Sequence, residues 1–336
     1  MPDDASLIGG QRVLQLALNA GEGDRLLVLI SGGASALIEH PLPGVSLADI
    51  RTINRQLLKA GADIKEINTV RKKISAIKGG RLAVAAMPAE VFLLAISDVP
   101  GDCLSDIGSG PCSPDTTSPA DAHEILRRYH CDVPVGVLAA INNPNNTPPA
   151  PNYPAFAHVT SRVIARAKDA LDAVSRVVGE AGYEPVRLGD DISTSARDLA
   201  AEHARLAMQH RSRQGRYALI SGGETSVQVV NPEGRGGRNT EYLLSLALAL
   251  DGASSIWALA ADTDGIDGTE DNAGATISPD TLVHATRLGL DGPAMLADNL
   301  SYDFFAAVEG LLVTGPTGTN VNDLRIILID GLNATH

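Results

Sequence analysis

The chain has few aromatic residues and few cysteines. Phe, Trp and Tyr together make up 3% of its 336 residues, so we expect a core built mainly from Ala, Val, Leu and Ile. The three cysteines, Cys103, Cys112 and Cys131, form no CxxC pair and are odd in number. This pattern argues against a disulfide framework and a zinc site, and it favours free thiols in a reducing cytoplasm.

The sequence also lacks a targeting segment and any apolar run long enough to span a bilayer. Its N-terminus, Met1-Pro2-Asp3-Asp4, has neither a basic nor an apolar region, so no signal peptide is predicted. The longest apolar runs, such as residues 91–96, are much shorter than a membrane-spanning helix requires. We therefore expect a soluble, cytoplasmic protein without a membrane partner.

Positive charge is scarce. The 27 Lys and Arg residues stand against 40 Asp and Glu residues, which gives a net charge of −13. This balance argues against a nucleic-acid partner, because non-specific binding to nucleic acids needs a basic surface. An anionic small substrate stays compatible with it, since a local cationic pocket can lie on an acidic protein.

Two common nucleotide-binding motifs are missing. No stretch matches GxxxxGK[ST], the phosphate-binding loop of many kinases, and none matches GxGxxG, the fingerprint of dinucleotide-binding domains. These absences weaken the hypotheses of a P-loop kinase and of an ordinary dehydrogenase. A nucleotide site, if the protein has one, is of another type.

Short apolar runs that end in glycine-rich or acidic loops are what the sequence does contain. Five such runs lie at residues 26–30, 91–96, 217–220, 256–260 and 311–313. Amphipathic helical patterns lie between them, at 47–61, 63–77, 166–181 and 192–211. The alternation predicts an α/β fold with Rossmann-like, mostly parallel sheets that carry helices on both faces. Ligands are then expected at the carboxyl ends of the strands.

The polar segment 211–216 resembles a linker, so we predict two domains, 1–210 and 211–336, with a cleft between them. A short similarity between two segments of the sequence supports two similar units. Residues 28–33 and 218–223 both run from a strand into Ser-Gly-Gly. Two short matches do not establish a duplication.

The two Ser-Gly-Gly loops are candidate anion-binding loops. They consist of Ser31, Gly32 and Gly33 in the first half and Ser221, Gly222 and Gly223 in the second. Glycine lets successive backbone amides converge on an anion, and Ser35 and Thr225 could add hydroxyl donors. The alternative is that each loop is simply a tight turn from strand to helix.

Three cations are candidates for binding an anionic ligand. Arg71 and Lys78 are seven residues apart, about two turns if one helix carries both, and they fall at the edge of its apolar stripe. Arg238 and Asn239 follow Gly236-Gly237 at the start of another helical pattern. Arginine suits bidentate recognition of carboxylate or phosphate. The alternatives are a solvated cationic helix face and a capped surface arginine.

An acidic loop follows the apolar run at 256–260. Asp262, Asp264, Asp267 and Asp271 alternate there with Gly265 and Gly268, a composition that suits Mg²⁺ held jointly with phosphates. An EF-hand is excluded, because its sixth position is Asp267 rather than Gly and its twelfth is Ala273 rather than Glu. The alternative is a set of turn-forming aspartates.

Taken together, these stretches resemble the glycerate 2-kinase family, whose C-terminal part is called the MOFRL domain. The matching stretches are Leu29–Leu37, Ile67–Arg81, Ser97–Asp102, Ile107–Pro111, Ser221–Thr225, Gly236–Asn239, Thr263–Gly268 and Thr314–Asp323. They cover nearly the whole chain in order. The resemblance implies an ATP-dependent kinase that uses Mg²⁺ and phosphorylates D-glycerate at its 2-hydroxyl.

The resemblance also suggests roles for the candidate residues. Arg71, Lys78 and Arg238 would bind the glycerate carboxylate and the phosphates. The Ser31–Gly33 loop with Ser35, and the Ser221–Thr225 loop with Glu224 and Asn239, would hold nucleotide or substrate. Asp264 and Asp267 would hold Mg²⁺, or one of them would accept the proton of the hydroxyl.

Departures from the family pattern keep other hypotheses open. Residues 2–6, Pro-Asp-Asp-Ala-Ser, resemble a region in the middle of the family's first domain, so we expect the family's N-terminal segment to be absent. Ala34 stands where a third glycine is usual, and Lys73 stands where His is common. Residues 165–168, Ala-Arg-Ala-Lys, replace what is often Gly-Ser-Asn-Arg. The alternatives are a hydroxypyruvate reductase that uses NAD(P)H and a truncated, non-catalytic homologue. The domain that binds ATP and the oligomeric state, a homodimer included, stay open.

Overall fold

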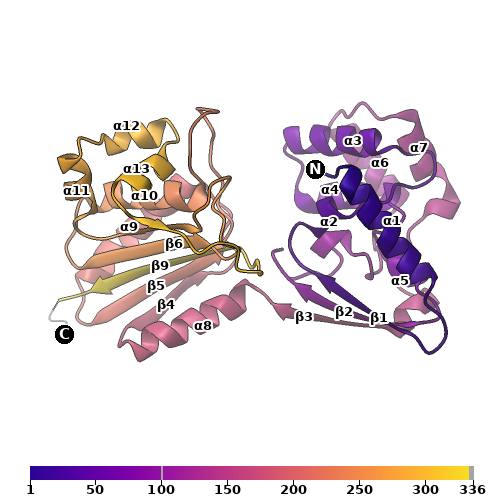
Figure 1. The fold of residues 1–336 in the computed structure, drawn as a ribbon, viewed down its shortest axis with the longest axis horizontal. Helices are drawn as coiled ribbons and strands as arrows, with labels where there is room; N and C mark the ends of the chain where they lie inside the picture. The colour runs from indigo at the N-terminus through magenta and orange to yellow at the C-terminus, as the bar shows by residue number, and fades with distance from the viewer. Residues whose placement is uncertain (100, 333–336) are drawn as a thin grey trace. The chain divides into compact units, whose positions relative to one another are not determined.

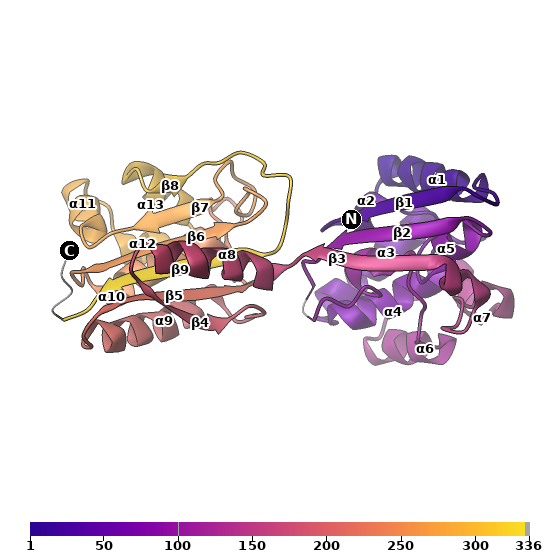
Figure 2. The ribbon, with the colours of Figure 1, turned by 90° about the horizontal axis from the view of Figure 1, so that it is seen from below.

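The computed structural model describes residues 1–99 and 101–332; Pro100, which lies within the matched stretch at 97–102, is outside them. The chain divides into two compact units, unit 1 (residues 1–164) and unit 2 (residue 165 onward). Each has a sheet and helices of its own (Figures 1 and 2). Within the described residues, no helix is both long enough and apolar enough to cross a membrane.

Unit 1 is built on a three-stranded sheet with the order β1-β2-β3. Its strands are β1 (Arg25–Ile30), β2 (Glu90–Ile96) and β3 (Val159–Ala165), and β1 pairs with β2 in parallel. Its helices are α1 (Asp4–Leu18), α2 (Ala34–Leu37), α3 (Leu47–Lys59), α4 (Ile64–Ile74), α5 (Arg81–Ala85), α6 (Pro119–Arg128) and α7 (Val135–Asn142). Apolar residues of α3, α4, α6 and α7 form a helical core of their own.

The helices of unit 1 lie on one side of its sheet, whereas the sequence predicted helices on both faces (Figures 1 and 2). On the other side of β1, the side chains of Leu27 and Leu29 are 59% and 68% exposed. The apolar run at 26–30 predicts a strand buried on both faces, and this prediction is wrong for β1. Composition alone does not show which neighbours cover a strand.

Unit 2 contains a six-stranded sheet with the order β4-β5-β9-β6-β7-β8. The strands are β4 (Glu184–Gly189), β5 (Arg216–Gly223), β6 (Ile256–Asp262), β7 (Gly274–Ile277), β8 (Leu311–Leu312) and β9 (Asp323–Asp330). The helices are α8 (Ala167–Glu180), α9 (Ala196–Arg211), α10 (Arg238–Leu250), α11 (Thr281–Arg287), α12 (Gly292–Ala297) and α13 (Ser301–Ala307). Here α8 packs on one face of the sheet and α9 and α10 pack on the other (Figure 1). This unit has the two-faced cover that the sequence predicted.

The sheet of unit 2 is mixed rather than mostly parallel. Only β4 and β5 pair in parallel, and the last strand, β9, runs antiparallel between β5 and β6. β7 and β8 extend the sheet with further antiparallel pairs. Hydrophobic runs indicate burial but not direction, so the insertion of β9 could not be read from them.

The predicted domain boundary between residues 210 and 211 needs correction. It lies inside unit 2, because β4 and β5 on its two sides form neighbouring strands of one sheet. The residues at 212–215 connect α9 to β5 within unit 2 and pair with residues 331 and 332. Their polar composition indicates a turn at the surface. It does not indicate whether the elements before and after the turn belong to the same domain.

Side-chain caps fix the starts of two helices of unit 1, α3 and α4. The side chain of Ser46 accepts a hydrogen bond from the amide of Asp49 (3.1 Å) at the start of α3. Asp63 accepts one from the amide of Glu66 (2.8 Å) at the start of α4. Each such cap contributes about 1 kcal/mol. The two caps fix the positions of Asn54 on α3 and of Asn68 and Arg71 on α4.

A buried histidine joins α9 to α10 in unit 2 and makes stability depend on pH. His203 is 3% exposed, and its Nδ1 lies 2.8 Å from the hydroxyl of Tyr242. Burial, with a smaller effect of the Arg325 charge, lowers the pKa of His203 to about 4. An unfolded histidine has a pKa near 6.5, so unfolding takes up a proton between these two values.

We therefore expect unit 2 to lose about 2–3 kcal/mol of unfolding free energy as the pH falls from about 6.5 to about 4. The contribution is fully present above pH 6.5 and is lost towards acid, because the folded state disfavours the charged imidazole. Urea unfolding at pH 7.5, 6 and 5 measures it. His203→Gln should show a flatter profile than the wild type, while His158→Gln, a change at an exposed position, should keep the wild-type profile.

Candidate functional site

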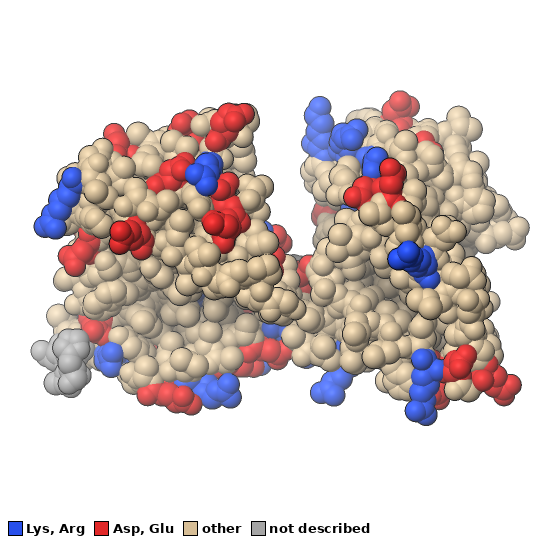
Figure 3. Space-filling view, in the orientation of Figure 1, with Lys and Arg blue, Asp and Glu red and all other residues tan. Residues whose placement is uncertain are grey.

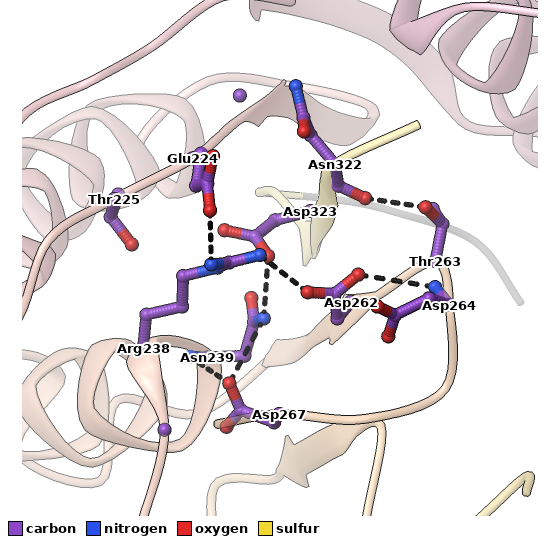
Figure 4. Close-up of polar contacts among 12 residues, drawn as sticks. Glu224, Thr225, Arg238, Asn239, Asp262, Thr263, Asp264, Asp267, Asn322 and Asp323 are labelled. Atoms are coloured by element: carbon purple, nitrogen blue, oxygen red, sulfur yellow. Dashed lines mark hydrogen bonds and ion pairs between the residues drawn. The ribbon is translucent and has the colours of Figure 1, made fainter. Parts of the chain in front are cut away.

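Arg238 is the centre of a charged cluster in unit 2 (Figure 4). Its Nε donates to Oδ1 of Asp323 (2.8 Å), and its two terminal nitrogens donate to Glu224 (2.5 Å) and Asp262 (2.5 Å). Glu224 follows β5, Asp262 ends β6 and Asp323 begins β9. One guanidinium therefore ties together the ends of three adjacent strands and the first turn of α10.

The antiparallel insertion of β9 explains why Asp323 lies there. In the register of the sheet, Asp323 is opposite both Gly223 of β5 and Asp262 of β6. The start of an antiparallel strand lies beside the ends of its neighbours, so Asp323 reaches the same edge as Glu224 and Asp262. Asp262 belongs to the acidic loop that the sequence predicted to suit Mg²⁺, whereas Asp323, although in a matched stretch, was not predicted as a site residue.

The pKa values of Arg238 and Asp262 in this cluster are both raised. Burial tends to lower the pKa of Arg238, but the nearby carboxylates, Asp323 first, outweigh it and raise the pKa above its ordinary value. Arg238 therefore stays charged at any working pH. Burial raises the pKa of Asp262, with Asp323 and Asp264 adding to the shift, whereas Arg238 opposes it. The cluster has more carboxylates than guanidinium groups, so a proton or a cationic ligand is favoured near Asp262.

A second arginine supports the cluster from inside the sheet. Arg325 is 1% exposed and pairs with Oδ2 of Asp323 at 2.5 Å. It also donates to the carbonyl oxygen of Gly222 (3.2 Å) and to the hydroxyl of Thr225 (3.3 Å). Asp323 thus bridges two arginines, and Arg325 fixes the segment that leads to Glu224. Sequence analysis missed Arg325, because a charged residue within a strand carries no local signal of burial.

The second Ser-Gly-Gly stretch is not a loop. Ser221, Gly222 and Gly223 are the last residues of β5 and pair with β9. A Cβ atom on Gly223 would lie 2.2 Å from the backbone nitrogen of Ile192, so glycine is needed there for a close backbone approach. This packing role corrects the predicted loop conformation. Phosphate binding by Ser221–Gly223 stays a prediction.

Asp267 and Asn239 serve the start of α10. Asp267 is 1% exposed and accepts hydrogen bonds from the amides of Asn239 (3.0 Å) and Thr240 (2.9 Å). Its second oxygen also accepts from the hydroxyl of Thr240 (3.0 Å). Asn239 is buried and donates to Asp323 (2.9 Å). Both carboxylate oxygens of Asp267 are therefore committed to the helix that carries Arg238.

The two predicted magnesium ligands, Asp264 and Asp267, lie in different surroundings. No group of three or more His, Cys, Asp or Glu residues is arranged to hold a metal ion in the part of the chain that the structure describes. Asp264 is half-buried, and its Oδ1 accepts from the amide of Ile266 (2.8 Å). Since Asp267 caps α10, Asp264 is the better placed of the two to meet a cation, and binding of Mg²⁺ by these side chains stays a prediction.

In unit 1, Arg71 is held by two asparagines. Its Nε donates to Oδ1 of Asn54 (2.9 Å), and a terminal nitrogen lies 3.5 Å from Oδ1 of Asn68. Burial lowers the pKa of Arg71, and the charge of Glu39 opposes the shift. Arg71 is thus oriented by neutral amides, which leaves its positive charge available for an anion.

Lys78 has a different place from the predicted one. α4 ends at Ile74, so Lys78 lies beyond the helix and is not two helical turns from Arg71. It is 1% exposed, pairs with the buried carboxylate of Glu39 and donates to the carbonyl oxygen of Ser35 (2.8 Å). Burial lowers the pKa of Lys78. The contacts make Lys78 a tie between the Ser31–Ser35 segment and the core, and its role as an anion ligand stays a prediction.

The first Ser-Gly-Gly stretch forms the turn from β1 to α2. Gly33 takes a left-handed conformation (φ 77°) as the residue before α2, while Ser31 and Gly32 connect it to the strand. The hydroxyl of Ser35 lies 2.7 Å from that of Ser109, which in turn donates to Asn68 (2.9 Å). The turn is thus linked by hydroxyl groups to the asparagine that contacts Arg71.

Two family models match the chain, one in each unit. Residues 1–142 match the family described as "Domain of unknown function (DUF4147)", and residues 217–323 match the MOFRL family. A D-glycerate 2-kinase from Thermotoga maritima is 38% identical over 98% of this chain and 78% of its own length. The chain belongs to the MOFRL glycerate kinase family.

Other family members agree with this assignment. The crystal structure of the Thermotoga maritima glycerate kinase superposes with a TM-score of 0.87, covering 98% of this chain and 78% of that one. A protein from Agrobacterium vitis that is provisionally named hydroxypyruvate reductase is 45% identical over 98% of this chain and 75% of its own length. The family thus includes proteins with two different names, and the fold is common to this chain and the kinase.

Proposed function

We propose that this family member is a kinase that transfers the γ-phosphoryl group of ATP to the 2-hydroxyl of D-glycerate. The observation that carries the proposal is the match to the Thermotoga maritima glycerate kinase, at 38% identity and a TM-score of 0.87 over both units. The held guanidinium groups of Arg71 and Arg238 supply the chemistry that anionic substrates need. Three free cysteines agree with a cytoplasmic location.

The roles of the two arginines follow from their surroundings. Arg71 lies among neutral amides, so we assign it to the carboxylate of glycerate. Arg238 lies where the ends of β5 and β6 meet the start of β9, and we assign it to the phosphates of ATP; the Mg²⁺ that enters with the nucleotide would offset the carboxylates around it. Glu224 is the exposed partner of Arg238, at 56% of its side chain, and is the carboxylate that a phosphate would displace.

The hydroxyl proton of glycerate needs an acceptor. Asp267 is committed to the helix start and Asp262 to Arg238, whereas Asp264 keeps one oxygen with only a long contact to Asn320 (3.4 Å). We therefore assign proton acceptance to Asp264. Phosphoryl transfer depends mainly on positioning and charge neutralisation, so this step is a modest part of the rate acceleration.

A coupled assay of ADP release tests the proposal. With wild-type protein, MgATP and D-glycerate, we expect turnover that L-glycerate does not support, and a product whose phosphorus signal couples to the proton on carbon 2. Release of ADP that does not depend on glycerate, or a phosphate on carbon 3, would contradict it. The assay uses the chain as it exists.

The second candidate is a hydroxypyruvate reductase, which the name of the Agrobacterium vitis relative favours. Such an enzyme needs NADH or NADPH, and the sequence has no GxGxxG fingerprint. A fluorescence titration with both nucleotides decides between the two. Binding accompanied by oxidation of the nucleotide on addition of hydroxypyruvate supports the reductase, and absence of binding removes it.

A further inference from the structure

We infer that Ser109 is a positioning residue: a strained left-handed turn holds its hydroxyl where it orients Arg71 towards the carboxylate of the substrate. The inference rests on the proposed function for the identity of that substrate. The contacts that support it lie within unit 1 and do not involve the charged cluster around Arg238.

The turn around Ser109 is left-handed over three successive residues. Gly108, Ser109 and Gly110 have φ values of 60°, 61° and 60°. Only glycine takes this conformation freely, and a residue with a Cβ atom there is strained. Ser109 is therefore the one member of the turn that bears a backbone cost, and it is fully buried. What Ser109 has and glycine would lack at this buried position is its hydroxyl, which is hydrogen-bonded to Asn68.

The surroundings leave the turn little freedom to relax. A Cβ atom on Gly110 would lie 2.8 Å from the backbone of Ser105. The amides of Gly79 and Gly80 donate to the carbonyl oxygens of Ser109 (3.0 Å) and Gly110 (2.8 Å). The segment that follows α4 therefore clamps the turn, and the Ser109 side chain is fixed relative to α4.

The hydrogen bonds of Ser109 have a definite direction. Its hydroxyl donates to Oδ1 of Asn68 at 2.9 Å, so its only proton is used. The Ser35 hydroxyl, 2.7 Å away, must then be the donor to Ser109. Oδ1 of Asn68 also faces a terminal nitrogen of Arg71 at 3.5 Å. The relay runs from Ser35 through Ser109 to Asn68, whose amide oxygen is held in place to receive Arg71.

Arg71 is thus oriented from two sides. Asn54 on α3 holds its Nε, and Asn68, fixed by Ser109, faces one terminal nitrogen. Because this guanidinium is already held in one orientation, binding a carboxylate costs it less conformational entropy. Without the Ser109 hydroxyl, Asn68 keeps only the 3.3 Å hydrogen bond from its Nδ2 to the carbonyl oxygen of Asp106 besides its contact with Arg71. The loss should therefore loosen Asn68 and then Arg71, and weaken carboxylate binding in particular.

Two substitutions separate this role from a purely structural one. Ser109→Ala loses the hydroxyl and keeps the strain, whereas Ser109→Gly loses both. We expect the glycine variant to melt roughly 2–4 °C above the alanine variant. Both should raise the KM for D-glycerate about tenfold, with the KM for ATP unchanged. A structural residue would make the loss of activity follow the melting temperature instead.

A matched pair at another left-handed position is the control. His130 has a φ of 51° and is exposed, in unit 1 as well. His130→Gly should also melt above His130→Ala, and both should keep wild-type kinetics. This pair shows how large the backbone effect alone is.

A second readout needs no substrate. Phenylglyoxal modifies arginines, and the rate at Arg71 can be followed by peptide mass spectrometry in the wild type and in both Ser109 variants. We expect modification of Arg71 to become several-fold faster in both variants, while that of Arg51, which donates to the carbonyl oxygen of Pro2, stays the same. If the wild type does not phosphorylate D-glycerate, the proposed function fails and the labelling alone decides the positioning role. An unchanged labelling rate, or an unchanged KM in an active enzyme, overturns the inference.

Discussion

Replacing Arg238 by lysine is expected to lower kcat/KM for D-glycerate and ATP about 30- to 900-fold, which corresponds to about 2–4 kcal/mol of transition-state stabilisation. The three donor positions of Arg238 engage three carboxylates at the ends of β5, β6 and β9. Lysine keeps the positive charge but has one nitrogen, so it cannot hold these carboxylates and a phosphate at fixed angles. Steady-state kinetics with varied ATP measure the effect.

Two controls belong to this experiment. Arg235→Lys changes an arginine that is half-exposed and pairs with Glu270 and Asp303, and it should leave kcat/KM within about twofold of the wild type. The free energy of unfolding of Arg238→Lys should fall by only about 1–2 kcal/mol, because lysine keeps a positive charge beside the buried Asp262 and Asp323 and loses only hydrogen bonds of the guanidinium. Unchanged kinetics in Arg238→Lys would show that the phosphates bind elsewhere.

On the face shown in Figure 3, charged side chains lie scattered among uncharged ones, without a continuous basic surface.

Removing the partner of a buried lysine should have the largest effect on stability. Glu39→Ala is expected to lower the free energy of unfolding by about 3–5 kcal/mol, because Lys78 would remain buried without a carboxylate. Both side chains are only 2% exposed, so water cannot replace the lost partner. The loss should shrink at alkaline pH, where Lys78 can be buried as a neutral amine. Urea unfolding measures both.

The double substitution Glu39→Leu with Lys78→Met tests the cause. An apolar pair of similar size should restore stability to within about 1–2 kcal/mol of the wild type, since no charge is left unpaired. Glu90→Ala breaks a surface pair with Arg25 in the same unit and should cost less than about 1 kcal/mol. If Glu39→Ala costs no more than this control, Lys78 is not a structural tie and is free to bind an anion, as the sequence predicted.

The comparison of Arg71 with Lys78 shows what the sequence could and could not predict about the site. Both were chosen as cations seven residues apart on one helix, and Arg71 does lie on α4 with its guanidinium held by amides. Lys78 follows the end of the helix and turns inward to Glu39, a partner 39 residues away. Helical periodicity places residues that share a helix, but it cannot locate the point where the chain leaves the helix.

By itself, the sequence determined the local elements and the kinship of the protein. The apolar runs marked β1, β2, β5, β6 and β8, and the Ser46 capping box marked the start of α3, because burial and capping depend on residues a few positions apart. The glycine-rich motifs identified the family. The tertiary structure alone decided the place of β9, which brings Asp323 beside Asp262 and Arg238. That pairing joins segments 61 to 85 residues apart, and no local pattern records which distant strand a hydrophobic run will pair with or in which direction.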